Sequence, residues 1–168
     1  MGTDAARQEV FRFGDTVCYA ATRADFDRLN ADMREEDRAE CRVFGMDGDD
    51  GRNWDEAVAI EIAGELVGIV GFGKFADGNE LSRERMMFFL TTNAVWRHRV
   101  AFVKSSRPVM RWAMNTLLPS WVNTVFSFPI ATYRGSVEWQ ERVLGFAAYG
   151  IVAFNGIRHV GMIKRKGV

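Results

Sequence analysis

The sequence has no apolar run long enough to cross a bilayer. Its longest runs, 66–70 and the glycine-containing stretch 145–154, fall far short of the roughly 18 residues that a membrane span needs. The N-terminal segment has no apolar core behind a basic start, so it does not resemble a secretory signal. We therefore expect a cytoplasmic protein with no membrane partner.

Cysteine and histidine are also scarce. The two cysteines, Cys18 and Cys41, are too few to cross-link a domain of 168 residues and lack the spacing of metal ligands, which favours a reducing compartment. The two histidines, His98 and His159, are far apart in the sequence and have no accompanying cysteines. The sequence therefore predicts no metal site.

Apolar residues, in contrast, are plentiful. They make up 48% of the 168 residues, which is enough for the core of one domain. We expect a single domain over 1–168, in which 1–15 form a flexible N-terminal segment.

Charge is divided unequally along the chain, although the net charge is zero. Residues 1–84 contain 20 acidic and 10 basic side chains, whereas residues 85–168 contain 2 acidic and 12 basic ones. Either the two halves pair with each other in the fold, or the second half builds a basic surface suited to an anionic ligand or partner.

Apolar periodicity predicts the elements of the first half. A β-rich segment at 16–22 is followed by two helices at 23–33 and 34–44, the first with apolar residues spaced by three and four. Two apolar β-rich runs, 57–62 and 66–75, flank a short turn with Gly64, which indicates a hairpin. The glycines at 68–73 fall inside a strand, where they indicate a bulge or close packing.

The second half alternates strands and helices. The run 85–92 is apolar enough for a central strand, and a helix follows at 101–118, or from about Arg107 with Pro108 in its first turn and Ser105 or Ser106 as its cap. A strand at 121–130, a helix at 136–144 and a hairpin across Asn155-Gly156 complete the chain. The resulting order, β-α-α-β-β-β-α-β-α-β-β, predicts a mixed α/β sheet flanked by helices.

This order and three local patterns resemble the GNAT superfamily, the N-acetyltransferases that use acetyl-coenzyme A, over about 17–164. The patterns are CYAATRADFDRLNADMREEDRAE near the start, FFLTTNAVWRHRVAFVKSSRPVMRWAM in the middle and SVEWQERVLGF near the end. The resemblance implies a GNAT-like acyltransferase fold in which the strand 85–92 is central and splays from the strand 121–130. FLTTNAVWR and SVEWQERVLG are also similar to small GNAT-like proteins of short-tailed phages, of the internal virion or head-morphogenesis type.

The resemblance implies an acetyl-coenzyme A site after the central strand. The superfamily loop reads Gln/Arg-x-x-Gly-x-Gly/Ala, and Arg97 fits its first position, but Val100 and Phe102 replace the glycines that let backbone N–H groups approach the pyrophosphate. Side-chain charge is then left to hold the phosphates. Alternatively, the loop is a solvated basic segment without a ligand. The expected cofactor-binding residues are Leu90, Thr91, Thr92, Arg97, His98, Arg99 and Lys104.

The resemblance also implies a general base near the central strand and a tyrosine acid on the last helix. Glu84, beside the strand entrance, is the candidate base, and its alternative is a solvated turn residue. The usual tyrosine position holds Glu141, so Tyr133 is the candidate acid, and its alternative is an aromatic residue packed over the sheet end.

Two classes of function follow from the resemblance. One is an N-acetyltransferase that passes an acetyl group from acetyl-coenzyme A to an amine. The other is an inactive GNAT scaffold that acts as a virion-associated structural or interaction protein, in the virion or the host cytoplasm. The partners are then an amine substrate, a protein, or further copies in a virion or homo-oligomeric assembly. We expect no specific nucleic-acid partner.

Overall fold

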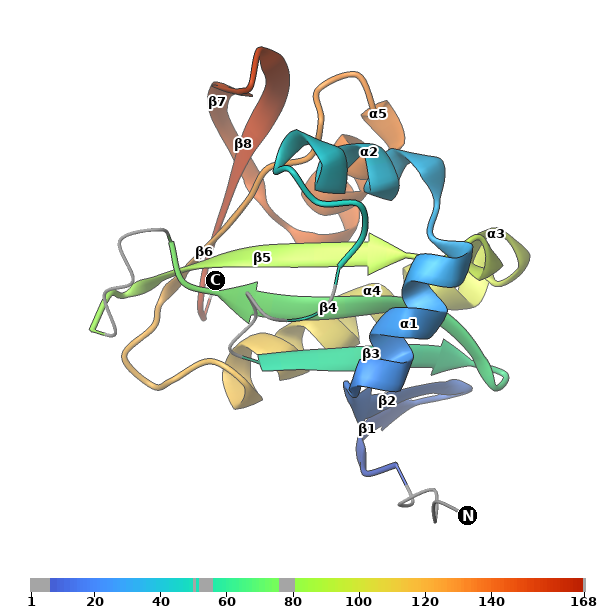
Figure 1. Cartoon of the computed structure of the whole chain (residues 1–168). Helices are drawn as coiled ribbons and strands as arrows, with labels where there is room; N and C mark the ends of the chain where they lie inside the picture. Colours follow the sequence, from blue (N-terminus) through green and yellow to red (C-terminus); the bar gives the residue numbers. More distant parts are fainter. Residues whose placement is uncertain (1–6, 50, 52–55, 76–80, 168) are drawn as a thin grey trace.

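The chain folds around one eight-stranded sheet with helices on both faces (Figure 1). The computed structural model describes residues 7–49, 51, 56–75 and 81–167. The strands are β1 (Glu9–Phe13), β2 (Thr16–Ala20), β3 (Glu56–Ile62), β4 (Glu65–Gly73), β5 (Glu84–Thr91), β6 (Thr124–Ser127), β7 (Ala147–Phe154) and β8 (Ile157–Arg165). The helices are α1 (Arg23–Asp32), α2 (Glu35–Val43), α3 (Ala94–Arg97), α4 (Arg99–Thr116), α5 (Arg134–Trp139) and the π-helix η1 (Gln140–Leu144).

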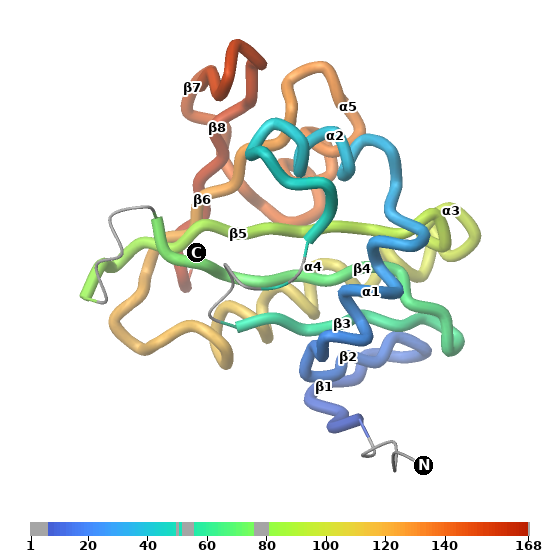
Figure 2. Tube along the Cα trace, in the orientation of Figure 1, coloured from blue at the N-terminus to red at the C-terminus, as the bar shows by residue number. Residues whose placement is uncertain are grey.

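The strands lie in the order β1-β2-β3-β4-β5-β6-β8-β7, and every neighbouring pair is antiparallel except β5 with β6. This parallel pair is short: it runs from Glu84 opposite Thr124 to Met86 opposite Phe126. Beyond these residues the two strands separate, and the chain trace in Figure 2 shows β6 turning away from β5. The expected central strand and its splay from the next strand are both confirmed.

Both expected hairpins are present, and their turns explain why. Ala63 and Gly64 have φ of 50° and 80°, and Asn155 and Gly156 have φ of 47° and 77°. Two consecutive residues with positive φ make the turn whose twist matches that of the flanking strands. Asn and Gly adopt this conformation at low cost, so the second hairpin can be predicted from the sequence.

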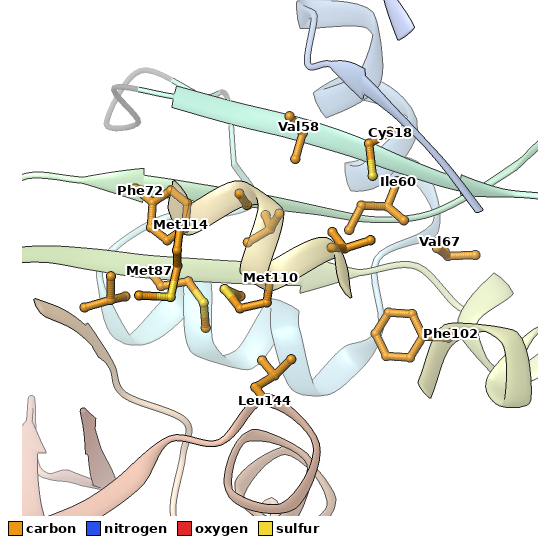
Figure 3. Close-up of a cluster of buried hydrophobic side chains, with 14 of the residues drawn as sticks. Cys18, Val58, Ile60, Val67, Phe72, Met87, Phe102, Met110, Met114 and Leu144 are labelled. Carbon is orange, nitrogen blue, oxygen red and sulfur yellow. The ribbon is translucent and has the colours of Figure 1, made fainter. Parts of the chain in front are cut away.

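Apolar side chains form one core layer on each face of the sheet. On one face, α4 packs over the strands with a cluster that includes Cys18, Phe72, Met87 and Met110 (Figure 3). On the other face, α1 and α2 cover a smaller cluster that includes Leu29 and Leu90. The helices on opposite faces hold the central strand β5 between two apolar layers.

The structure corrects three details of the expected elements. Glu9–Phe13 forms β1 and pairs with β2, although 1–15 were expected to be flexible; residues 1–6 lie outside the described part. Helix α4 begins at Arg99, so Pro108 lies in its interior and not in a first turn. Ser105 and Ser106 do not cap a helix, because their hydroxyls donate to the Phe102 carbonyl oxygen within α4.

A substitution at Gly68 tests how closely β4 packs against β5. A Cβ at this position would lie 2.7 Å from the carbonyl oxygen of Leu90, which is backbone and cannot move freely. We expect Gly68→Ala to lower the free energy of unfolding by about 1 to 3 kcal/mol in urea denaturation. The control is Gly150→Ala in β7, where nothing lies within 4 Å, and its effect should stay within about 0.5 kcal/mol. Equal effects of the two changes would contradict this packing.

Candidate functional site in the gap between β5 and β6

The separation of β5 from β6 leaves backbone groups of β5 facing the gap. Thr92 N–H donates to the Val67 carbonyl of β4, and hydrogen-bonded and non-hydrogen-bonded pairs alternate along antiparallel strands. Phe89, three residues earlier, therefore directs its N–H and C=O away from β4 and toward the gap. This open strand edge can pair with an extended ligand.

Helix α2 is held against the end of β5 by Asp37. The Asp37 carboxylate accepts hydrogen bonds from the backbone N–H of Thr91 at 2.9 Å and from its hydroxyl at 2.5 Å. Arg34 pairs with Asp37 at 3.2 Å and donates its own N–H to the Thr91 carbonyl. Thr91, an expected cofactor-binding residue, is thus engaged by α2.

This anchor places Glu40 in the gap. Glu40 lies three residues after Asp37, on the same face of α2, and its Oε1 accepts a hydrogen bond from the N–H of Ile130 at 3.1 Å. Burial raises the pKa of Glu40 to about 8, and the Asp37 charge adds to the shift, whereas the Ile130 N–H and the Arg34 charge oppose it. No motif in the sequence marks Glu40 as a site residue. Its spacing from Asp37 alone does not distinguish a buried carboxyl from a solvated helix face.

Gln140 enters the gap from the opposite side. It is the first residue of η1, it is buried, and its Oε1 has no hydrogen-bond partner among the residues that the structure describes. Its neighbour Glu141, at the position of the usual tyrosine, is exposed. The π-helix shifts the phase of the helix, and such turns occur frequently at functional sites. Gln140 is therefore the polar side chain that this helix presents to the gap.

The space that remains in the gap is small, about 30 Å³, far below the roughly 300 Å³ at which small-molecule sites begin. Aromatic rings fill most of the gap between the strands. Phe44 meets Phe88 edge-on, and Phe89 packs against Trp139 with ring centroids 4.8 Å apart. The residues around the space are Glu40, Cys41, Phe44, Met46, Met86, Met87, Phe88, Phe89, Leu90, Ser127, Phe128 and Gln140. The gap is thus an apolar site with two polar side chains.

His159 of β8 lies beside this site and is fully buried. Its Nδ1 is 3.0 Å from the Ile157 carbonyl, and its ring packs against Phe44 and Phe154. Burial lowers the pKa of His159. A neutral ring at physiological pH follows, with Nε2 lacking a partner in the described part of the chain.

The expected phosphate-binding loop contains α3 and the start of α4. Arg97 Nε donates to Glu65 Oε2 at 3.1 Å, and His98 Nε2 lies 3.0 Å from the same oxygen. These two contacts hold the pKa of Glu65 below its usual value. Arg99 and Lys104 are exposed and form no ion pair with a described residue.

The two residues in place of the loop glycines behave differently. Val100 is 61% exposed and points away from the core. Phe102 is buried and stacks on Trp139 with ring centroids 5.5 Å apart. Phe102 and Trp139 together close the space between α4 and α5 beside Phe89.

The two expected catalytic residues are not brought together. Glu84 is exposed at the start of β5, where β5 and β6 are still paired, about 23 Å along the strand from Thr91 at roughly 3.3 Å per residue. Tyr133 is half-buried at the N-terminus of α5 and lies about 10 Å along the helix from Gln140. Neither residue borders the gap.

The described ranges contain no group of three or more His, Cys, Asp or Glu side chains arranged to hold a metal ion. No described helix is both long enough and apolar enough to cross a membrane.

No family model and no curated protein matches this chain, but solved structures do. Aminoglycoside acetyltransferase AAC(6')-Ib in complex with coenzyme A is 15% identical, with 90% of this chain and 95% of that chain covered at a TM-score of 0.63. A GNAT-family acetyltransferase from Bacillus anthracis is 8% identical, with 96% and 99% covered at a TM-score of 0.64. The chain has the GNAT acetyltransferase fold.

A third similar structure is a chimera of the spermidine N-acetyltransferase SpeG from Vibrio cholerae with hSSAT. It is 15% identical, with 91% of this chain and 96% of that chain covered at a TM-score of 0.62. All three matches extend over nearly the whole chain. The shared fold is therefore not limited to one part of the chain.

The raised pKa of Glu40 predicts a pH dependence of stability. An ordinary glutamate releases its proton near pH 4.5, whereas Glu40 in the folded chain keeps it to about pH 8. Between these values the folded state binds one more proton than the unfolded state, so this contribution to stability falls as pH rises. We expect the stability of the wild type relative to Glu40→Gln to decrease by roughly 1 kcal/mol per pH unit from pH 5 to 8.

Urea denaturation of both proteins at several pH values measures this difference. A difference that stays constant from pH 5 to 8 would contradict the burial of the Glu40 carboxyl.

Proposed function

We propose that the chain is an N-acetyltransferase that binds acetyl-coenzyme A in the gap between β5 and β6 and acetylates an amine, with Glu40 as general base. The observation that carries the proposal is the Glu40 carboxyl, which α2 directs into an apolar gap at the centre of the sheet. Glu40 is half-buried and has no ion-pair partner among the described residues, and a carboxyl partly removed from water in this way costs stability. Such groups are frequent at catalytic sites.

The open edge of β5 supports binding of the coenzyme. The N–H and C=O of Phe89 can pair with an amide-containing arm as a neighbouring strand would. The arm then leads toward the N-terminus of α4, where Arg99 and Lys104 are available for phosphate oxygens. The structures of AAC(6')-Ib with coenzyme A and with acetyl-coenzyme A support this assignment by analogy of fold.

The proposed reaction transfers the acetyl group directly from acetyl-coenzyme A to the amine. The amine nitrogen forms a bond to the acetyl carbonyl carbon, the carbon–sulfur bond breaks, and the thiolate leaves. Glu40 accepts the proton that the amine loses, and a base whose pKa is near the working pH suits this role. The side-chain amide of Gln140 can donate a hydrogen bond to the carbonyl oxygen as negative charge develops there.

Access to the gap requires one side-chain movement. The stack of Phe89, Phe102 and Trp139 fills the route between α4 and α5. Trp139 is half-buried, and its Nε1 donates a single hydrogen bond, to the Ser106 hydroxyl at 3.2 Å. We propose that Trp139 swings out of this stack when the coenzyme enters.

The same aromatic packing favours a second candidate, an inactive GNAT scaffold with a structural or interaction role, of the virion-associated kind that the phage resemblance implies. The gap holds only about 30 Å³, and Asp37 occupies the hydrogen-bonding groups of Thr91. On this alternative the buried polar groups are what is left of a former active site, and the chain binds no coenzyme.

Calorimetric titration with acetyl-coenzyme A and an assay of thiol release separate these candidates. We expect saturable binding by the wild type, and a loss of turnover with a polyamine of about 10² to 10⁴ in Glu40→Gln, because that change removes the general base. Glu84→Gln and Tyr133→Phe are matched controls that keep turnover. Absence of coenzyme binding would support the scaffold, and full turnover in Glu40→Gln would refute the role of Glu40.

A substitution of Glu65 tests whether the loop that contains Arg97 and His98 binds the phosphates of the coenzyme. Its carboxylate engages Arg97 and His98, which would otherwise be available to phosphate. We expect Glu65→Gln to strengthen coenzyme binding a few-fold at low ionic strength, because it releases both cationic side chains. Glu138→Gln, an exposed change of the same charge on α5, is the control. Weaker or unchanged binding in Glu65→Gln alone would place the phosphates elsewhere.

A further inference from the structure

A second and much larger hollow lies at the other end of the sheet. It has a volume of about 870 Å³ and runs between the C-terminal half of α4, the end of η1 and the end of β8. Its lining residues are Arg107, Met110, Arg111, Met114, Asn115, Leu144, Gly145, Ala147, Ile163, Lys164, Arg165, Lys166 and Gly167. Lys164 is opposite Val125, in the part of β6 that is still paired with β5, so this basic groove is separate from the gap.

The charges around the basic groove have one sign. Five of its lining residues are basic and none is acidic. Arg107 and Arg111 lie one turn apart on α4, and burial together with these two charges lowers the pKa of Lys164. Such mutual repulsion is relieved when an anion binds among the cations.

Among the residues that the structure describes, no ion pair neutralises the cations of the basic groove. Ion pairs that join the acidic first half to the basic second half include those of Glu65 with Arg97 and His98, and neither cation lines the basic groove. After residue 84 the only acidic residues are Glu138 and Glu141, and neither lines the basic groove. The basic groove therefore favours the second interpretation of the charge asymmetry, a basic surface for an anionic ligand.

Two of the cations contact backbone carbonyls at the end of η1. Arg107 donates through Nε to the Val143 carbonyl at 2.9 Å and through a second nitrogen to the Arg142 carbonyl, so η1 orients its guanidinium. Lys164 Nζ lies 3.5 Å from the Gly145 carbonyl. Arg111 and Lys166, at the two sides of the basic groove, have no side-chain partner among the described residues and are free to reach a ligand.

The floor between the cations is apolar. Met110, Met114 and Leu144 are buried beneath the basic groove, and Ile163 is half-buried beside them. Figure 3 shows Met110, Met114 and Leu144 close together on this face of the sheet. Thioether side chains adapt to flat or irregular apolar surfaces. The basic groove thus combines a soft apolar floor with a cationic rim.

We propose that the basic groove binds a small phosphorylated ligand with an apolar or aromatic body, of the nucleoside polyphosphate class. Guanidinium groups match phosphate oxygens in pairs, and five cations suit a ligand with several negative charges. The apolar floor accommodates the body of the ligand. A concave site of this volume lies within the range of about 300 to 1,000 Å³ typical of small-molecule sites, whereas a nucleic-acid duplex needs an extended surface. The proposal does not depend on acetyl transfer.

The test uses ATP as the probe, because ATP has no pantetheine arm or thioester. We expect saturable binding in calorimetry, with shifts of the Met110 and Met114 methyl resonances in NMR. Arg111→Ala with Lys166→Ala should weaken binding more than about tenfold, since hydrogen bonds to charged groups are stronger than those between neutral groups. The matched control, Arg134→Ala with Arg158→Ala, removes two exposed cations outside the basic groove and should leave binding unchanged.

A second variant avoids any loss of side-chain packing. Asn115→Asp places a negative charge in the basic groove at an exposed, nearly isosteric position and should also weaken ATP binding. Tripolyphosphate should bind more weakly than ATP, because it lacks the body that contacts the floor.

Several results would overturn the proposal. They are no saturable ATP binding, equal losses in the basic-groove and control variants, methyl shifts confined to methionines outside the basic groove, or tighter binding of tripolyphosphate than of ATP. Preference for an RNA or DNA duplex over ATP would also overturn it, in favour of a nucleic-acid surface. None of these results bears on Glu40, so this proposal and the acetyltransferase proposal can fail separately.

Discussion

The separation of β5 from β6 after three residue pairs is the constraint on which the site depends. Where two central strands stop pairing, their backbone groups need partners from other parts of the chain, from water or from a ligand. Here α2 supplies Asp37 and Glu40 from one face, and η1 supplies Gln140 from the other side. Segments that are distant in the sequence therefore meet at a single point in the sheet.

The groups that meet there are costly to bury. The Glu40 carboxyl, the Gln140 amide and the His159 ring all occupy an aromatic environment, and two of them have a polar atom without a partner in the described part of the chain. Replacement by apolar residues of similar shape would relieve this cost. Their presence beside an open strand edge is the physical reason to consider the gap a reactive site and not simply the core.

Most of the fold could be predicted from the sequence, whereas most of the site could not. The hairpin turns, the central strand and the helix faces are local signals, carried by Asn155-Gly156, Gly64 and the spacing of apolar residues. β1 was missed because Glu9–Phe13 alternates weakly and gains its stability from pairing with β2. Glu40 and Gln140 were missed because their burial depends on tertiary contacts, and for Gln140 also on a π-helix that moves the expected position by one residue.

The backbone amide of Phe89 gives the most direct test that the gap is the coenzyme site. In ¹⁵N NMR of the wild type, addition of acetyl-coenzyme A should shift the Phe89 resonance and slow its exchange with solvent, because its N–H faces the gap and would pair with the ligand. Saturable binding that leaves Phe89 unchanged, or no binding at any accessible concentration, would contradict this account.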